Sequence, residues 1–254
     1  DDMRCAISQS NYIPWRGYFQ LISEVDIFVF YDDVQFTKRD WRSRNRIMTP
    51  KGPIWLTIPV GKNRERTIEE VGLPNGEWRE NHLQTIRRVY SKQPHFETVM
   101  NIIRPWFENE EINTLSEFNQ GLIQDICEFL GIKTQFIRSS ELGVEGGRVD
   151  RLIRICNTIG AEEYLSGPAA KNYIDDEFEN SGIKLSWMEY GPFERYPQIG
   201  PKSVYEMSII DTMIMLGEDA LNLKRVTPFH QKMIGSHPSE LLAIQGKYGQ
   251  YTLQ

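Results

Sequence analysis

The chain has 254 residues, of which 40% are hydrophobic and 25% are charged, an ordinary composition for a globular protein. This length is sufficient for one large α/β domain with a full core. The net charge of −6 argues against a general nucleic-acid binder, and no apolar run approaches the roughly 18 residues of a membrane-spanning helix. Three cysteines without metal-binding spacing (Cys5, Cys127 and Cys156) are typical of core thiols, so we expect a cytoplasmic protein.

The N-terminal region predicts a strand, a loop, a helix and a second strand. Cys5–Ile7 forms a short apolar run before a polar loop, and residues 17–25 have helical spacing of apolar side chains. A second apolar run, residues 27–31, ends abruptly at Asp32 and Asp33. Ligands of open α/β sheets gather beyond the carboxyl ends of strands, so both loops are predicted at a binding edge. A buried βαβ unit with merely solvated loops is the open alternative.

The elements that follow predict a hairpin, a helical segment and a return to α/β alternation. Turn residues between two apolar runs favour a hairpin, and apolar spacing then favours three helices within about residues 78–131. We next expect strands at 134–137, 163–165 and 184–188, with helices at 148–159, 169–180 and 203–216. The predicted fold is α/β, a mostly parallel sheet with helices on both faces, HUP- or Rossmann-like. Residues 1–225 form its single domain, with a hairpin inserted at about 38–60, and residues 226–254 form a C-terminal extension.

Several long motifs give the chain a family resemblance. They run Gln9-x-x-Tyr12-x-Pro14-x-x-Gly17-Tyr18 and Tyr31-Asp32-Asp33-Val34-Gln35-Phe36, then Trp41, Asn45-Arg46 and Tyr164-Leu165-Ser166-Gly167-Pro168-Ala169-Ala170-x-x-Tyr173. On these motifs the chain resembles the WbqC-like family from about residue 4 to residue 216. The resemblance implies a role in bacterial O-antigen or lipopolysaccharide biosynthesis, with a nucleotide-linked sugar as the partner. This resemblance indicates the biosynthetic pathway, but it does not identify the reaction that the protein catalyses.

The opening of the chain is also similar to that of adenylate-forming HUP-fold enzymes. In those enzymes a His-x-Gly-His motif at the start of the first helix contacts ATP. The corresponding residues here are Trp15-Arg16-Gly17-Tyr18, without a histidine. The resemblance therefore implies the fold but not the ATP chemistry, and ATP with Mg²⁺ is an open cofactor. Arg16 and Tyr18 remain candidates for phosphate contacts.

Basic residues gather in one segment of this acidic chain. Residues 37–66 contain nine basic residues and two acidic ones, a local charge of +7. Such a patch suits a compact anion such as a diphosphate, and arginine forks match phosphate oxygens. We expect part of a set to converge near the loops after the first two strands: Lys38, Arg39, Arg42 and Arg46. An ordinary solvated hairpin face is the alternative interpretation.

Two further groups of residues are candidates for chemistry and binding. Asp32 and Asp33, at the end of a strand, suit a general base or a cation site, although turn capping explains them equally well. Ser166 and Gly167 precede a predicted helix whose first turn carries Lys171, which favours anion binding weakly. The remaining predicted binding residues come from the motifs and are Gln9, Tyr12, Pro14, Gly17, Gln35, Asn45 and Tyr173.

Two functions of different classes follow from these features. The first is an enzyme that transfers an acyl or aminoacyl group onto a nucleotide-linked amino sugar, a transferase or amide-forming ligase. The second is a non-catalytic module that binds a nucleotide sugar or a pathway partner. The four histidines are scattered without metal spacing, so no metal site is predicted. A homo-oligomer is left open.

Overall fold

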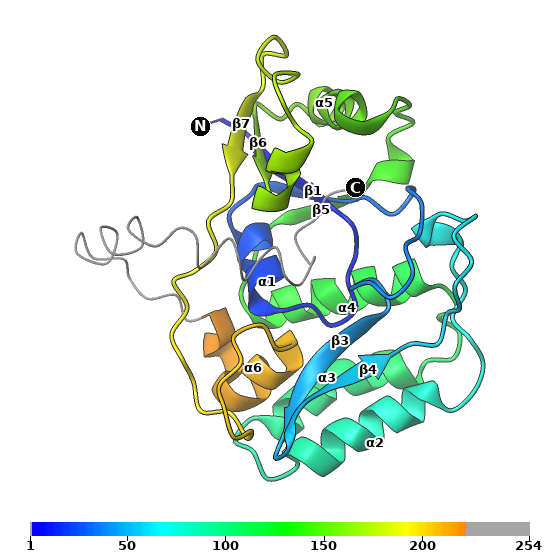
Figure 1. The fold of residues 1–254 in the computed structure, drawn as a ribbon, viewed down its shortest axis with the longest axis vertical. Coiled ribbons are helices and arrows are strands. Elements are labelled where there is room, and N and C mark those ends of the chain that lie inside the picture. Colours follow the sequence, from blue (N-terminus) through cyan, green and yellow to red (C-terminus); the bar gives the residue numbers. More distant parts are fainter. Residues whose placement is uncertain (1, 222–254) are drawn as a thin grey trace.

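A computed structural model describes residues 2–221, and a five-stranded sheet lies at the centre of this part (Figure 1). Its strand order is β5-β2-β1-β6-β7, and each neighbouring pair is parallel. The strands are β1 (Arg4–Ser8), β2 (Ile27–Phe30), β5 (Gln135–Arg138), β6 (Glu163–Ser166) and β7 (Lys184–Trp187). This confirms the predicted parallel-rich α/β fold.

The sheet is buried on both faces, because alternate residues of its central strands enter two separate apolar clusters. Ala6, Phe28 and Phe30 belong to the larger cluster, whereas Ile7 and Val29 belong to the smaller one. All five side chains are at most 1% exposed. The first two strands therefore lie in the core.

Helices cover both faces of the sheet. The larger cluster contains residues of α1 (Arg16–Ser23), α2 (Trp78–Tyr90), α3 (Phe96–Glu108), α4 (Leu115–Phe129) and α6 (Ile209–Leu216). The smaller cluster contains residues of α5 (Arg148–Ile159). A separate antiparallel hairpin, β3 (Arg44–Thr49) and β4 (Gly52–Thr57), contacts α6. Figure 1 shows this hairpin and α2–α4 together, away from β6, β7 and α5.

Two predicted helices are shorter than their patterns suggested. The helix expected at 169–180 is a 3₁₀ turn, Pro168–Asn172, and beyond it the backbone N–H of Asp175 bonds the Glu177 side chain instead. The helix expected at 203–216 begins only at Ile209, because Gln198 bonds both the N–H and the carbonyl of Val204. The predicted C-terminal extension lies outside the described residues, and the single-domain division stays a prediction.

A buried histidine joins the loop after β1 to the helical segment and the hairpin. His82 of α2 has its Nε2 3.0 Å from the carbonyl of Thr57 and its Nδ1 2.6 Å from the Tyr12 hydroxyl. A carbonyl only accepts, so Nε2 carries the proton and Nδ1 accepts from Tyr12. Burial lowers the pKa of His82 from 6.5 to about 4, although the Thr57 bond opposes this shift.

The buried His82 predicts a pH-dependent stability. Between pH 6.5 and about 4 the unfolded chain protonates this histidine and the folded protein does not, so acid destabilises the fold. The free energy of unfolding should fall by about 1.5 kcal/mol between pH 6.5 and pH 5 from this group. In urea titrations, the free energy of unfolding of His82→Gln should lack this pH-dependent contribution, and that of His95→Gln should keep it. An unchanged slope in His82→Gln would contradict the account.

Candidate functional site

The carboxyl ends of the parallel strands bring the predicted loops to one edge of the sheet. β1 lies between β2 and β6, so the chain changes direction across the sheet at β1. β1 pairs with β2 at four positions, but with β6 only at its first two, Arg4↔Glu163 and Cys5↔Tyr164. β1 and β6 therefore lose their pairing toward their carboxyl ends. This is the topological switch point at which open α/β sheets bind ligands.

Asp32 is the centre of a buried hydrogen-bond network at this edge. Its carboxylate accepts bonds from the N–H (2.8 Å) and hydroxyl (2.6 Å) of Ser10. Two side chains of α4, Ser116 at 2.5 Å and Gln120 at 2.9 Å, donate to the same carboxylate. The Asp32 side chain is 0% exposed. In this arrangement it fixes the loop after β1 against α4.

Asp33 faces a different neighbour. Arg151 of α5 donates two hydrogen bonds to its carboxylate, at 2.9 and 2.5 Å, and Ser139 donates a third at 2.6 Å. Burial alone would raise the pKa of Asp33, but the bonds from Arg151 and Ser139 outweigh it and lower the pKa. The Asp33 side chain retains 21% exposure. The two adjacent carboxylates therefore do not share a ligand, and their role as a base stays a prediction.

Arg42 is a buried cation beside the loop after β1. Its guanidinium bonds the side-chain oxygen of Gln9, and its side chain is 1% exposed. The carboxylate of Asp40 lies 3.5 Å away and is itself partly exposed. The Nε of Arg42 finds no hydrogen-bond partner among residues 2–221. Among residues 2–221, the buried charge of Arg42 thus forms an ion pair with Asp40, at the long distance of 3.5 Å.

The other predicted cations take separate positions. Lys38 is half-buried and Arg39 is exposed, and both precede Arg42 in the same segment. Arg46 lies on β3, where its guanidinium is 5.5 Å from the centre of the Trp55 ring. Arg42 contacts the loop after β1 through Gln9, and whether Arg46 joins it in an anion site stays a prediction.

Most motif residues hold the loop after β1 in shape. The Tyr18 hydroxyl donates to the carbonyl of Gln9 at 2.8 Å, and the Asn45 amide donates to the carbonyl of Tyr12 at 3.1 Å. A Cβ at Gly17 would lie 1.9 Å from the Trp15 ring, so only glycine fits there. The loop's backbone is thereby fixed from α1 and β3.

Two further motif residues tie this loop to the C-terminal part of the described chain. The carbonyl of Pro14 accepts from the N–H of Ile209, at the start of α6. Arg16 is 1% exposed, donates to the carbonyl of Glu194, and lies 4.3 Å from the centre of the Phe193 ring. Burial lowers the pKa of Arg16. In the described structure its charge therefore faces aromatic rings.

The residues predicted to bind an anion after β6 lie at a short 3₁₀ turn and not at the start of an α-helix. Ser166 and Gly167 are buried, and the hydroxyl of Ser166 donates to the carbonyl of Gly167 at 3.1 Å. The following element is a short 3₁₀ turn that starts with Pro168, which has no N–H to offer an anion. The Lys171 ammonium is 5.3 Å from the centre of the Trp187 ring.

Tyr173 and Gln35 complete the predicted set. Tyr173 is half-buried, and burial raises the pKa of its phenol. Gln35 is exposed, and its amide donates to the carbonyl of Arg64 at 3.1 Å. The structure places Gln35 in the loop after β2 and does not bring these two residues to Arg42 through any described contact.

Polar residues of α4 were missing from the predicted site. Ser116 and Gln120 bind Asp32, and Asn119 donates to the carbonyl of Arg42 at 2.9 Å. All three are buried, and the Asn119 side-chain oxygen has no partner among the described residues. Their spacing of three and four positions places them on one face of the helix. That face was the available sequence signal.

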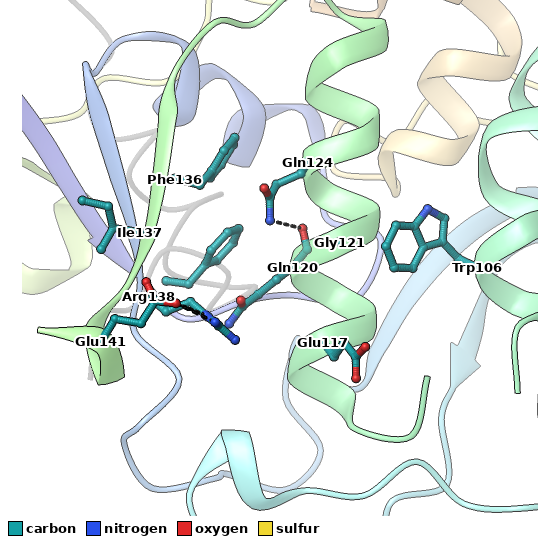
Figure 2. A pocket seen from close by; sticks show the side chains of 10 residues that line it. Trp106, Glu117, Gln120, Gly121, Gln124, Phe136, Ile137, Arg138 and Glu141 are labelled. Atoms are coloured by element: carbon teal, nitrogen blue, oxygen red, sulfur yellow. Dashed lines mark hydrogen bonds and ion pairs between the residues drawn. The ribbon is translucent and has the colours of Figure 1, made fainter. Parts of the chain in front are cut away.

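A pocket of about 350 Å³ lies between α4 and the edge strand β5. Figure 2 shows Gln120 and Gln124 pointing from α4 toward Phe136 and Arg138, with Trp106 on the other flank of the helix. Glu117, Glu141, Phe30, Gly121 and Ile137 complete the lining. Because Gln120 also binds Asp32, this pocket adjoins the network that fixes the loop after β1.

Sequence comparison assigns a family to this arrangement. The model of the WbqC-like protein family matches residues 9–223, which include the loop after β1, Asp32, Arg42 and the polar face of α4. The chain belongs to the WbqC-like protein family. A relative in Mycobacterium tuberculosis, "Uncharacterized protein Rv1507c", is 39% identical over 220 residues, which cover 85% of this chain and 95% of that protein. No solved structure matches the chain.

Residues 2–221 of this WbqC-like chain lack two kinds of feature, a metal-binding cluster and a membrane-spanning helix. Residues 2–221 contain no cluster of three histidine, cysteine or acidic side chains that could hold a metal ion. Over the same residues, no helix is long and apolar enough to cross a membrane.

The Asp32 network predicts a large loss of stability on substitution. Asp32→Asn places an amide N–H₂ opposite groups that donate, which leaves buried donors unpaired. We expect the free energy of unfolding to fall by about 2–4 kcal/mol. The exposed Asp150→Asn, measured by the same urea titration, should change it by less than about 0.5 kcal/mol. Equal stability of the two variants would show that the network does not hold this edge together.

Proposed function

We propose that this protein is an enzyme of bacterial surface-polysaccharide biosynthesis that transfers an acyl or aminoacyl group onto a nucleotide-linked amino sugar. Membership of the WbqC-like family supports the pathway. The observation that supports the nucleotide-linked substrate is Arg42, which we propose binds the diphosphate. The sheet edge beside the β1–β6 switch point supports a ligand at this place.

Arg42 has the environment of an anion-binding residue. Removing a charge from water costs several kcal/mol unless a partner of opposite charge is close. In the described part of the chain, the carboxylate that contacts Arg42 is that of Asp40, which is 3.5 Å away and partly exposed to solvent. A diphosphate would supply the missing acceptors at the unpartnered Nε, and a planar guanidinium matches phosphate oxygens bidentately.

The pocket between α4 and β5 suits the sugar. Aromatic rings such as Phe136 and Trp106 offer apolar surfaces. The side-chain oxygen of Gln120 and the amide of Gln124 offer hydrogen-bonding groups for hydroxyls, whereas the Gln120 N–H₂ already donates to Asp32 and Ser116. Asn119, which binds the carbonyl of Arg42, directly precedes Gln120 on α4. We therefore propose that the diphosphate lies at Arg42 and the sugar extends along α4 into this pocket.

The proposed reaction forms an amide. The amino group of the sugar attacks the acyl carbon, an N–C bond forms, the bond from that carbon to its carrier breaks, and the nitrogen loses a proton. A carboxylate at the site would accept that proton. Asp33 is the more accessible of the two predicted bases, because Asp32 is fully buried by its four donors.

One observation favours the second candidate, a non-catalytic nucleotide-sugar binding module. Both predicted bases are engaged, Asp32 by Ser10 and α4, and Asp33 by Arg151 and Ser139. A turnover assay with a uridine-diphosphate-linked amino sugar separates the two functions. It should include acyl thioesters, and amino acids with ATP. Binding without any turnover would support the module.

If Arg42 binds the diphosphate, Arg42→Met should change the stability of the protein little and weaken anion binding strongly. Replacing a buried charge by an apolar side chain of similar length should change the free energy of unfolding by less than about 2 kcal/mol without ligand. Binding of uridine diphosphate, measured by calorimetry, should weaken at least tenfold, because a charge-assisted contact is lost.

The matched control is Arg88→Met on the exposed surface of α2, which should leave both quantities unchanged. A variant Arg42→Met that unfolds readily but binds uridine diphosphate normally when folded would assign Arg42 a structural role alone.

A further inference from the structure

An exposed tryptophan on the hairpin marks a second part of the binding surface. Trp55 of β4 is 43% exposed, and among residues 2–221 only Met3 is another large apolar side chain left exposed. A single exposed apolar residue is common on protein surfaces. The surroundings of Trp55 distinguish it from such a residue.

Two arginines and a second tryptophan hold the Trp55 ring in place. The guanidinium of Arg44 lies 4.2 Å from the ring centre and that of Arg46 5.5 Å, and Arg46 is the direct cross-strand partner of Trp55. The ring of Trp41, which is buried, lies 5.5 Å from the same ring. Cation–π and aromatic contacts fix the orientation of the ring, so little conformational entropy remains to be lost on binding.

Trp55 is connected to the proposed diphosphate site by this same Trp41. Trp41 directly precedes Arg42, and its carbonyl accepts a hydrogen bond of 2.9 Å from the N–H of Tyr12, in the loop after β1. A ligand that contacts both Arg42 and Trp55 would therefore follow one short, ordered segment of the chain. The segment 37–66, which contains all of these residues except Tyr12, carries a charge of +7.

We propose that Trp55, on the part of its ring that the guanidinium groups of Arg44 and Arg46 leave exposed, stacks against the base of a nucleoside diphosphate whose phosphates lie toward Arg42. This inference rests on the proposed function and names the nucleotide part of its substrate. A nucleobase has the flat π-face that an exposed indole stacks on, and the flanking guanidinium groups favour an anion attached to it. Neither a free sugar nor a simple acyl group combines these two features.

The test compares ligands with and without a base. Uridine, thymidine and guanosine diphosphates and inorganic pyrophosphate are titrated into the full chain by calorimetry. In Trp55→Ala, the nucleoside diphosphate that binds the wild-type protein best should bind roughly 5- to 150-fold more weakly, the range for one lost stacked base. Pyrophosphate binding should change less than twofold, and Trp55→Phe should recover most of the affinity.

Two controls guard against indirect effects. Met3→Ala, at the other exposed apolar side chain, should bind all four ligands normally. Tryptophan fluorescence should be quenched by the nucleotide in the wild-type protein and much less in Trp55→Phe, which reports contact with that ring.

Different failures point to different errors. Normal nucleotide affinity in Trp55→Ala, together with loss of affinity in Arg42→Met, would overturn the stacking site and leave the proposed function standing. Equal affinity of the wild-type protein for pyrophosphate and every nucleoside diphosphate would also overturn stacking alone. Absence of binding of all four ligands to the wild-type protein would overturn both proposals.

Discussion

The carboxylate of Asp32 connects the parts of the chain from which the candidate site is built. Ser10 joins it to the loop after β1, and Ser116 and Gln120 join it to α4. Its own backbone carbonyl accepts from the N–H of Glu69 at 2.9 Å. Burying a carboxylate is costly without such donors, and with four of them the network becomes rigid and specific. The position of Arg42 depends on this network, because Gln9 precedes Ser10 and Asn119 precedes Gln120.

The adjacent residues Asp32 and Asp33 have different structural roles. Asp32 organises the edge of the sheet, and Asp33 forms an ion pair with Arg151 of α5, on the opposite face from α4. The buried positive charge of Arg42 then lies beside a fixed loop rather than a mobile one. The fixed loop holds the charge of Arg42 in one place, and an anion that binds this 1% exposed side chain must displace some of its present neighbours. Such a site suits the diphosphate of a nucleotide-linked substrate, and the β3–β4 hairpin beside it offers a second contact surface.

Apolar patterns in the sequence predicted the sheet. Two helices were predicted too long, because side chains in the folded chain bond backbone groups that those helices would have used. The apolar runs of the first two strands and the helical spacing within residues 78–131 were readable because those apolar side chains are buried. The late start of α6 was not, because Gln198 reaches Val204 only in the folded chain. Gln9 and Asp32 could be singled out from the motifs, and Arg42 from the basic segment at residues 37–66. For their partners on α4 the sequence offers only a polar face of the helix, and it does not say which residues that face contacts, because those residues lie far away in the sequence.

The central claim is that the diphosphate of a nucleotide-linked sugar binds at Arg42, beside the loop after β1. A crystal structure of the full chain with a uridine-diphosphate-linked amino sugar tests it most directly. The account predicts phosphate oxygens within hydrogen-bonding distance of the Arg42 guanidinium, with the uracil ring near Trp55. The sugar is expected toward the pocket between α4 and β5. A well-defined ligand elsewhere on the molecule, with Arg42 still contacting only Gln9 and Asp40, would contradict it.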